Sequence, residues 1–183
     1  LLLTDEKDLS GLPESICEAA ALRAKEKGKK GWLFNLTAPS YIPFMRYADS
    51  RKLRETMYRE YMSVGNKGDE YDNKEIIRQI INIRLEIAQL MGYNTYAEYS
   101  LKHTMAKNPA TVYNLLNQLL DAYKPVAINE YNAVQGFAMG MEKENITVMP
   151  WDWSYYSEKL KDIRFNVNDE MTRPYFELNN VKN

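Results

Sequence analysis

The fold of this chain is decided by residues 72–109, DNKEIIRQIINIRLEIAQLMGYNTYAEYSLKHTMAKNP, which hold its densest aliphatic periodicity. On a helical wheel at about 100° per residue, one apolar face covers roughly half the circumference and consists of Ile76, Ile77, Ile80, Ile81, Ile83, Ile87, Ala88, Leu90 and Met91. We expect this helix to be a core element that other helices pack around. Arg84 lies near the middle of the apolar face, where a buried guanidinium needs a partner. The pattern therefore predicts a structural ion pair for Arg84, in preference to a substrate contact.

Two capping boxes mark helix starts on either side of Gly92. Asp72 with Glu75 begins the aliphatic helix, and Thr95 with Glu98 begins a helix from residue 96 to about residue 104. Gly92 ends the first of these helices. Similar start and stop signals predict further helices over residues 13–27, 40–48, 51–62, 109–143 and 152–163. The chain is therefore predicted to be mainly α.

Short polar residues are expected to cap these other helices. Ser10 and Ser40 precede the first two, Asn108 precedes the long one, and Asn168 precedes a short turn near the end. Asp152 follows a proline and lies between two tryptophans, and we expect it to cap the helix that begins there. The alternative role for Asp152 is that of an acid with a raised pKa.

Strand character is limited to one convincing segment, residues 32–36, which is short, aromatic and alternating. A single strand needs a partner. Residues 146–148 could provide it, or chain that is not present here could do so. At most one or two short strands are therefore expected.

The helix over residues 51–62 alternates basic and acidic residues along one side. Arg51, Arg54 and Arg59 alternate with Glu55 and Glu60. This pattern is typical of a solvated, ion-paired helix face. We therefore interpret this side of the helix as surface.

Composition excludes several classes of protein. The 24 Lys and Arg residues and 25 Asp and Glu residues leave a net charge of −1, whereas polyanion binding needs a basic face, so nucleic acid is not an expected partner. One Cys excludes an internal disulfide framework and fits a reducing compartment, so we expect a cytoplasmic protein. No apolar run approaches the ~18 residues of a membrane span, and no membrane association is predicted.

The sequence contains no group of residues that together could form a catalytic, cofactor-binding or metal-binding site. His103 is the only imidazole and is interpreted as a structural histidine, and Cys17 as a buried small hydrophobic residue. One His and one Cys also exclude a zinc site built from several such ligands. We therefore predict no catalytic, cofactor-binding or metal-binding residues among residues 1–183.

A series of short motifs nevertheless resembles one known family. In order and spacing they are similar to the thimet-oligopeptidase-like zinc metallopeptidases, most of all to the peptidyl-dipeptidase (dipeptidyl carboxypeptidase) branch. The resemblance extends over nearly the whole chain. The motifs are residues 11–13 (GLP), 38–41 (APSY) with 43–44 (PF), 49–51 (DSR) with 53–55 (LRE), 71–73 (YDN), 85–88 (LEIA), 91–93 (MGY) with 96–97 (YA), 105–106 (MA), 151–153 (WDW) with 155–156 (YY), and 173–176 (RPYF).

This resemblance implies a parent enzyme that hydrolyses short peptides with zinc and releases dipeptides from the C-terminus. The family holds zinc through the two histidines of an H-E-x-x-H motif and a later glutamate, and all of them follow the R-P-Y-F segment. Residues 1–183 contain none of them and are expected to form a single helical segment before the catalytic region, inactive alone. The resemblance implies that this segment supplies scaffold, or part of the wall of the deep channel that the family encloses. Its expected partners are short peptide substrates and the remainder of the same polypeptide.

A second hypothesis belongs to a different class. The chain could be a stand-alone helical module that binds peptides or acts as a scaffold, without catalysis. An H-E-x-x-H motif encoded beyond Asn183 would favour the peptidase hypothesis over this one.

Overall fold

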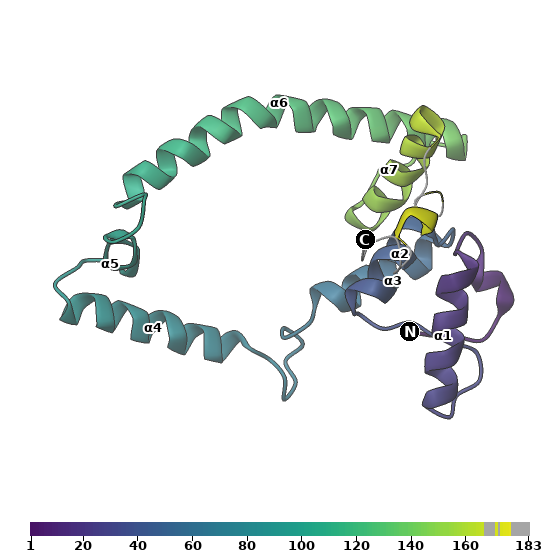
Figure 1. Cartoon of the computed structure of the whole chain (residues 1–183), viewed down its shortest axis with the longest axis horizontal. Helices are drawn as coiled ribbons and strands as arrows, with labels where there is room; N and C mark the ends of the chain where they lie inside the picture. The colour runs from purple at the N-terminus through teal and green to yellow at the C-terminus, as the bar shows by residue number, and fades with distance from the viewer. Residues whose placement is uncertain (167–170, 172, 177–183) are drawn as a thin grey trace. The chain divides into compact units, whose positions relative to one another are not determined.

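The computed structural model describes residues 1–166, 171 and 173–176, and it confirms a mainly α fold (Figure 1). The described residues contain seven α-helices, two short 3-10 helices and one two-stranded sheet. The α-helices are α1 (Glu14–Glu26), α2 (Ala38–Tyr47), α3 (Arg51–Met62), α4 (Lys74–Leu90), α5 (Tyr96–Leu101), α6 (Pro109–Glu142) and α7 (Pro150–Phe165). The 3-10 helices are η1 (Glu6–Leu9) and η2 (Arg173–Phe176), and the strands are β1 (Leu2–Leu3) and β2 (Trp32–Leu33). No helix in the described part of the chain is long and apolar enough to cross a membrane.

The chain divides into two compact units. The first unit comprises Leu1–Met62 and Asn132–Asn183, and the second comprises Ser63–Tyr131. Helix α6 contributes residues 109–131 to the second unit and residues 132–142 to the first. The prediction that residues 1–183 form one segment N-terminal to a catalytic region stays a prediction.

The small sheet lies in the first unit and joins β1 to β2. The strands are antiparallel, with Leu2 opposite Leu33 and Leu3 opposite Trp32. The predicted pairing of this strand with residues 146–148 is therefore wrong. Gly31, which precedes β2, has a φ of 103°, and a Cβ there would lie 2.1 Å from the carbonyl oxygen of Leu3. Only glycine fits this approach, because any side chain would collide with the neighbouring strand.

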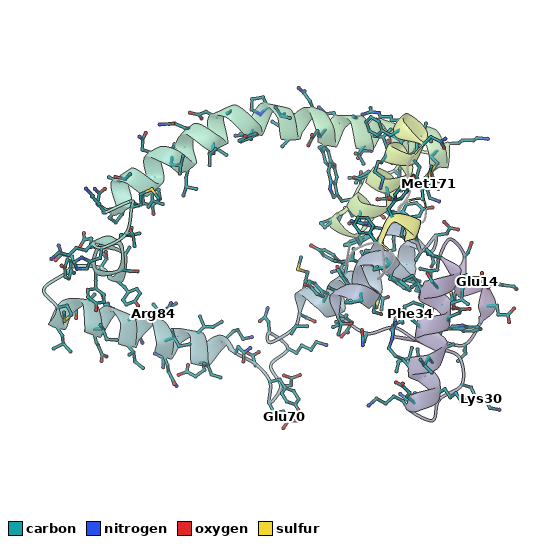
Figure 2. All side chains as sticks on the ribbon, in the orientation of Figure 1. Glu14, Lys30, Phe34, Glu70, Arg84 and Met171 are labelled. Atoms are coloured by element: carbon teal, nitrogen blue, oxygen red, sulfur yellow. The ribbon has the colours of Figure 1, made fainter. Side chains whose placement is uncertain are left out.

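The core of the first unit forms where α2, α3 and α7 pack together (Figure 1). Helix α1 packs on β2. Phe34, labelled in Figure 2, is buried and meets Phe44 of α2 edge to face, with ring centroids 4.8 Å apart. A second buried cluster forms between the end of α6, the segment before α7, and α7 itself. The buried hydrophobic residues of the two clusters are Leu3, Ala20, Phe34, Phe44, Met45, Ala48, Met57 and Trp151, and Val134, Ala138, Ile146, Val148, Tyr155 and Tyr156.

Helix α4, in the second unit, is not the buried core element that its periodicity predicts. Its aliphatic side chains are between 39% and 86% exposed, and Ala88 is the only buried residue in the helix. Among the described elements, α4 packs chiefly on the six-residue helix α5. The wheel identifies which face is apolar, but burial also requires a second apolar surface of similar size. Helix α5 is too short to provide it.

The predicted capping boxes have different outcomes. Thr95 accepts a hydrogen bond from the Glu98 N–H at 3.2 Å, and the Glu98 carboxylate accepts one from the Thr95 N–H at 3.3 Å, which confirms that box. The predicted box of Asp72 and Glu75 is wrong. The Asp72 carboxylate accepts hydrogen bonds from the N–H groups of Gly68 and Lys74 and so orders the preceding loop. The Glu75 carboxylate instead forms an ion pair within α4.

Both predicted serine caps are also wrong. The Ser10 hydroxyl donates to Asp49 at 2.7 Å, and α1 begins after Pro13 without a side-chain cap. Ser40 is buried inside α2, which begins two residues earlier, and its hydroxyl accepts a hydrogen bond from Arg23 at 3.0 Å. Asn108 does cap α6, because its side-chain oxygen accepts from the Thr111 N–H at 2.9 Å. The predicted cap at Asn168 lies outside the described residues.

Candidate functional site: a buried arginine and carboxylate cluster

The main cluster of charged groups in the first unit lies where α3 meets α7. Arg51 and Arg54 are three residues apart on α3 and therefore project from the same side of the helix. Both guanidinium groups bind the carboxylate of Asp152 on α7. The Arg54 side chain is 1% exposed and Asp152 is 0% exposed. The prediction of a solvated face is therefore wrong for Arg54, although the exposed pair of Arg59 and Glu55 does lie on the surface.

Arg54 uses its guanidinium to join three elements. It donates to the carbonyl oxygens of Ala48 at 2.8 Å and Asp49 at 3.0 Å, which follow the end of α2. It also donates to the Trp151 carbonyl oxygen at 3.3 Å and to Asp152 Oδ1 at 2.9 Å, both at the start of α7. The guanidinium carbon lies 4.0 Å from the ring centroid of Tyr155, a favourable cation–π position. Arg54 therefore holds the end of α2 and the start of α7 against α3.

Asp152 receives hydrogen bonds from both arginines and from its own helix start. Arg51 Nη2 lies 2.7 Å from Oδ2, and the Met149 N–H donates to the same oxygen at 3.1 Å. This last bond confirms that Asp152 caps α7. Burial alone would raise the pKa of the Asp152 carboxyl, but the hydrogen bonds from Arg51, Met149 and Arg54 outweigh it, so the pKa is lowered. The alternative role of Asp152 as an acid with a raised pKa is wrong.

A second carboxylate, Asp49, lies beside this cluster. It accepts hydrogen bonds from the hydroxyls of Ser10 at 2.7 Å and Tyr155 at 2.9 Å, and Lys159 Nζ is 3.9 Å away. Burial raises the pKa of Asp49, but these two hydrogen bonds and the nearby cations Lys159 and Arg54 lower it further than burial raises it. Burial and the bond to Asp49 raise the pKa of the Tyr155 phenol.

Tyr156 completes the cluster on the side of α6. Its hydroxyl donates to Glu142 at 2.9 Å, and its ring meets that of Tyr155 edge to face with centroids 5.2 Å apart. Burial and the bond to Glu142 raise the pKa of the Tyr156 phenol to about 12. Both phenols therefore stay protonated at neutral pH and act as hydrogen-bond donors.

These groups fix structure and are not arranged to transfer protons to a ligand. Acid–base catalysis needs a group whose pKa lies near the working pH and which substrate can reach. The carboxyls of Asp152 and Asp49 have lowered pKa values, the Tyr155 and Tyr156 phenols have raised ones, and Asp152 and Arg54 are buried. The cluster is a satisfied ion-pair network whose loss would leave a buried charge uncompensated.

The residues singled out in the sequence lie apart from this cluster. Arg84, labelled in Figure 2, is exposed on α4, and its guanidinium lies 5.3 Å from the ring centroid of Tyr96 on α5. It forms no ion pair within the described residues, so the predicted partner of Arg84 is not found there. His103, which we interpret as a structural histidine, is exposed and lies in the turn after α5, which ends at Leu101 and not at about residue 104. Cys17 on α1 is half-buried, and burial raises the pKa of its thiol.

The described residues do not fit a zinc site. They contain no group of three or more His, Cys, Asp and Glu side chains placed to hold a metal ion. The chain as a whole has one His and one Cys. Protein zinc sites commonly use three or four such ligands, and no chemical step through a metal is assigned to these residues.

Comparison with known proteins identifies a family model that matches most of the chain, including the residues of this cluster. The model of Peptidase family M3 matches residues 44–183, a range that includes Arg51, Arg54 and Asp152. The chain belongs to Peptidase family M3. The family M3 match also covers both aliphatic helices of the second unit, α4 and the first part of α6.

Curated relatives agree with membership of family M3. Oligopeptidase A of Haemophilus influenzae is 42% identical over 186 residues, which are 98% of this chain and 27% of the relative. Oligopeptidase A of Escherichia coli is 39% identical over 189 residues, which cover 100% of this chain and 27% of the relative. Dipeptidyl carboxypeptidase of Escherichia coli is 29% identical over 184 residues, again with 100% and 27% covered. The chain thus spans about a quarter of the length of the relatives it matches.

Proposed function

We propose that this chain is a scaffold segment of a zinc-dependent family M3 peptidase that hydrolyses short peptides. The observation that carries the proposal is the match of the family model to residues 44–183. The identity of 42% to an oligopeptidase A over nearly the whole chain supports it. In this proposal zinc and the groups that react with the peptide come from polypeptide outside residues 1–183.

The role proposed for residues 1–183 is architectural. The ion pair between Arg54 and Asp152 holds α3 to α7 across 98 positions of sequence, and Arg51 adds a hydrogen bond to the Thr147 carbonyl oxygen at 2.9 Å. Such a network fixes one arrangement of the first unit, because any other arrangement would leave these charges buried without partners. We propose that this unit supports the part of the enzyme that carries the reacting groups, as scaffold or channel wall.

Two specificities are compatible with the family. The motifs of the chain predict release of dipeptides from the C-terminus of the substrate, and this stays a prediction. The identities of 42% and 39% to oligopeptidase A, against 29% to dipeptidyl carboxypeptidase, support an oligopeptidase specificity more strongly. Short peptides are the proposed substrates in both cases, and the cytoplasm is the proposed compartment.

The gene provides the first test. We expect the reading frame beyond codon 183 to encode an H-E-x-x-H motif within a few hundred residues. A reading frame without this motif would contradict the peptidase proposal and favour a stand-alone helical scaffold or peptide-binding module.

Activity provides the second test. The intact polypeptide should cleave blocked peptides of about ten residues, and a zinc chelator should abolish the cleavage. The purified 183-residue chain should cleave none of them. Chelator-sensitive turnover by the 183-residue chain alone would contradict the proposal that the reacting groups lie outside it. Analysis of the cleavage products by mass spectrometry separates dipeptide release from internal cleavage.

A further inference from the structure

The aliphatic face of α4 has an uncommon feature, a cation within it that has no acidic partner among the residues that the structure describes. The neighbours of Arg84 at three and four positions along the helix are Ile80, Ile81, Ile87 and Ala88, and all four are apolar. Residues at these spacings are the ones that share a helix face. Arg84 therefore has no carboxylate within reach on its own helix, and its guanidinium contacts the ring of Tyr96 instead.

Arg78 on the same helix provides the contrast. It lies three residues after Glu75, and their side chains form an exposed ion pair, with Nη2 of Arg78 2.6 Å from Oε1 of Glu75. The polar side of α4 thus supplies its own countercharge, whereas the apolar side does not. An arginine among isoleucines is stable when exposed, as here, but it needs an acidic partner once that face is covered.

We propose that the aliphatic face of α4 is a docking surface for another segment of the same peptidase, one that has apolar side chains and places an Asp or Glu carboxylate against Arg84. This inference rests on the proposed function and identifies the partner surface. Two observations favour a segment of the same polypeptide over a second copy of the chain. The matched relatives extend over almost four times the aligned length, which supplies further polypeptide. The exposed face itself has no carboxylate, so two copies placed face to face would bring two arginines together.

The first experiment locates the carboxylate in the intact polypeptide. The Arg84→Lys variant places a primary amine at this position, and a water-soluble carbodiimide joins an amine to a carboxyl that touches it. We expect a cross-link to an Asp or Glu outside residues 1–183, identified by mass spectrometry. The matched Arg78→Lys variant should cross-link to Glu75. Cross-links from position 84 that occur only within residues 1–183, only between two copies, or not at all would overturn the proposal.

The second experiment compares stability in two contexts. In the intact polypeptide, Arg84→Met should lower the melting temperature by several degrees, because the partner carboxylate is left buried and unpaired, whereas Arg78→Met should leave it nearly unchanged. In the 183-residue chain alone, where Arg84 is exposed, both substitutions should have equally small effects. Equal effects of the two substitutions in the intact polypeptide would overturn the proposal.

Peptide hydrolysis separates this inference from the proposed function. An active peptidase without the cross-link at position 84 contradicts the docking surface only. An intact polypeptide that shows the cross-link and the stability difference but never cleaves peptides contradicts the peptidase function only.

Discussion

Arg54 on α3 and Arg84 on α4 show how differently the two units are built. Arg54 shares its side of α3 with Arg51 and is buried and bound to Asp152, whereas Arg84 lies among isoleucines of α4 and is exposed beside Tyr96. The difference lies in what faces each helix. Helix α3 packs on α2 and α7, while α4 packs chiefly on the short helix α5. The first unit therefore contains the ion-pair partner of its buried arginine, whereas Arg84 on α4 has no such partner within the described residues.

The comparison teaches that an apolar helix face shows a capacity for burial and not burial itself. The first unit closes its core and pairs the buried charges of Arg54 and Asp152 with residues 1–62 and 132–166. We infer that its stability is intrinsic, and that α4 gains most of its stability from a surface that other polypeptide provides. The predictions below change one feature in each unit, in order of decreasing effect.

The largest effect is expected for Asp152→Ala. Removing the carboxylate leaves the buried Arg54 guanidinium without its ion-pair partner, which costs about 3–5 kcal/mol. All three tryptophans, Trp32, Trp151 and Trp153, lie in the first unit, so their fluorescence during urea unfolding reports on that unit alone. The matched control is Glu75→Ala, which breaks an exposed pair on α4. It should cost less than about 0.5 kcal/mol when unfolding of both variants is also followed by circular dichroism at 222 nm, which detects both units. Equal losses for the two variants would contradict the buried network.

A slightly smaller effect is expected from the removal of apolar side chains. Met57 on α3 is 1% exposed, and Met57→Ala should cost about 2–5 kcal/mol because it leaves a cavity in the core. Ile80 on α4 is 42% exposed, and Ile80→Ala should cost less than about 1 kcal/mol. Urea unfolding followed by circular dichroism at 222 nm measures both. A loss for Ile80→Ala as large as that for Met57→Ala would show that α4 is buried in solution.

Two glycines with positive φ allow a similar comparison of backbone positions. A Cβ added at Gly31 would lie 2.1 Å from the Leu3 carbonyl oxygen. A Cβ added at Gly92 would have no other heavy atom within 4 Å. Gly92→Ala should cost about 1 kcal/mol from strain alone, and Gly31→Ala about 2–3 kcal/mol because β1 must also move. Thermal unfolding of the two variants gives the difference. A costlier Gly92→Ala would contradict the close pairing of β1 with β2.

The smallest effect in this series is the loss of stability of the first unit between pH 7 and pH 4. The pKa values of Asp152 and Asp49 are lowered in the folded state. Their stabilising contribution is therefore complete above the ordinary Asp pKa of about 4 and is lost as the pH falls through the lower folded-state values. The urea midpoint of tryptophan fluorescence should fall slightly to pH 4 and steeply below it. In Asp49→Asn the steep part should be smaller, and an unchanged profile would contradict the lowered pKa of Asp49.

Local features of the fold could be predicted from the sequence because neighbouring residues determine them. The bounds of α3, the capping box of Thr95 and Glu98, and the start of α6 at Asn108 follow from hydrogen bonds within a few positions. The general class, mainly α, follows from the same periodicity. These features do not depend on which other surface a helix meets.

The candidate site could not be predicted because its partners are far apart along the chain. Arg54 and Asp152 are separated by 98 positions. The alternating charges of α3 would look the same in the sequence if all of them were solvated. They therefore do not reveal that Arg51 and Arg54 bind a buried carboxylate. The spacing of Arg51 and Arg54 places them on one side of α3, but it does not reveal which carboxylate they meet. For the same reason, neither the partner of β2 nor the exposure of α4 follows from local pattern.

Hydrogen exchange of the 183-residue chain, followed by mass spectrometry, tests the contrast between the units most directly. Amides in α3 and α7 should be protected to nearly the full free energy of unfolding, because their exchange requires the first unit to open. Amides in α4 should exchange orders of magnitude faster, since a helix of 17 residues without a covered apolar face is only marginally stable. Protection in α4 equal to that in α3 and α7 would contradict the account.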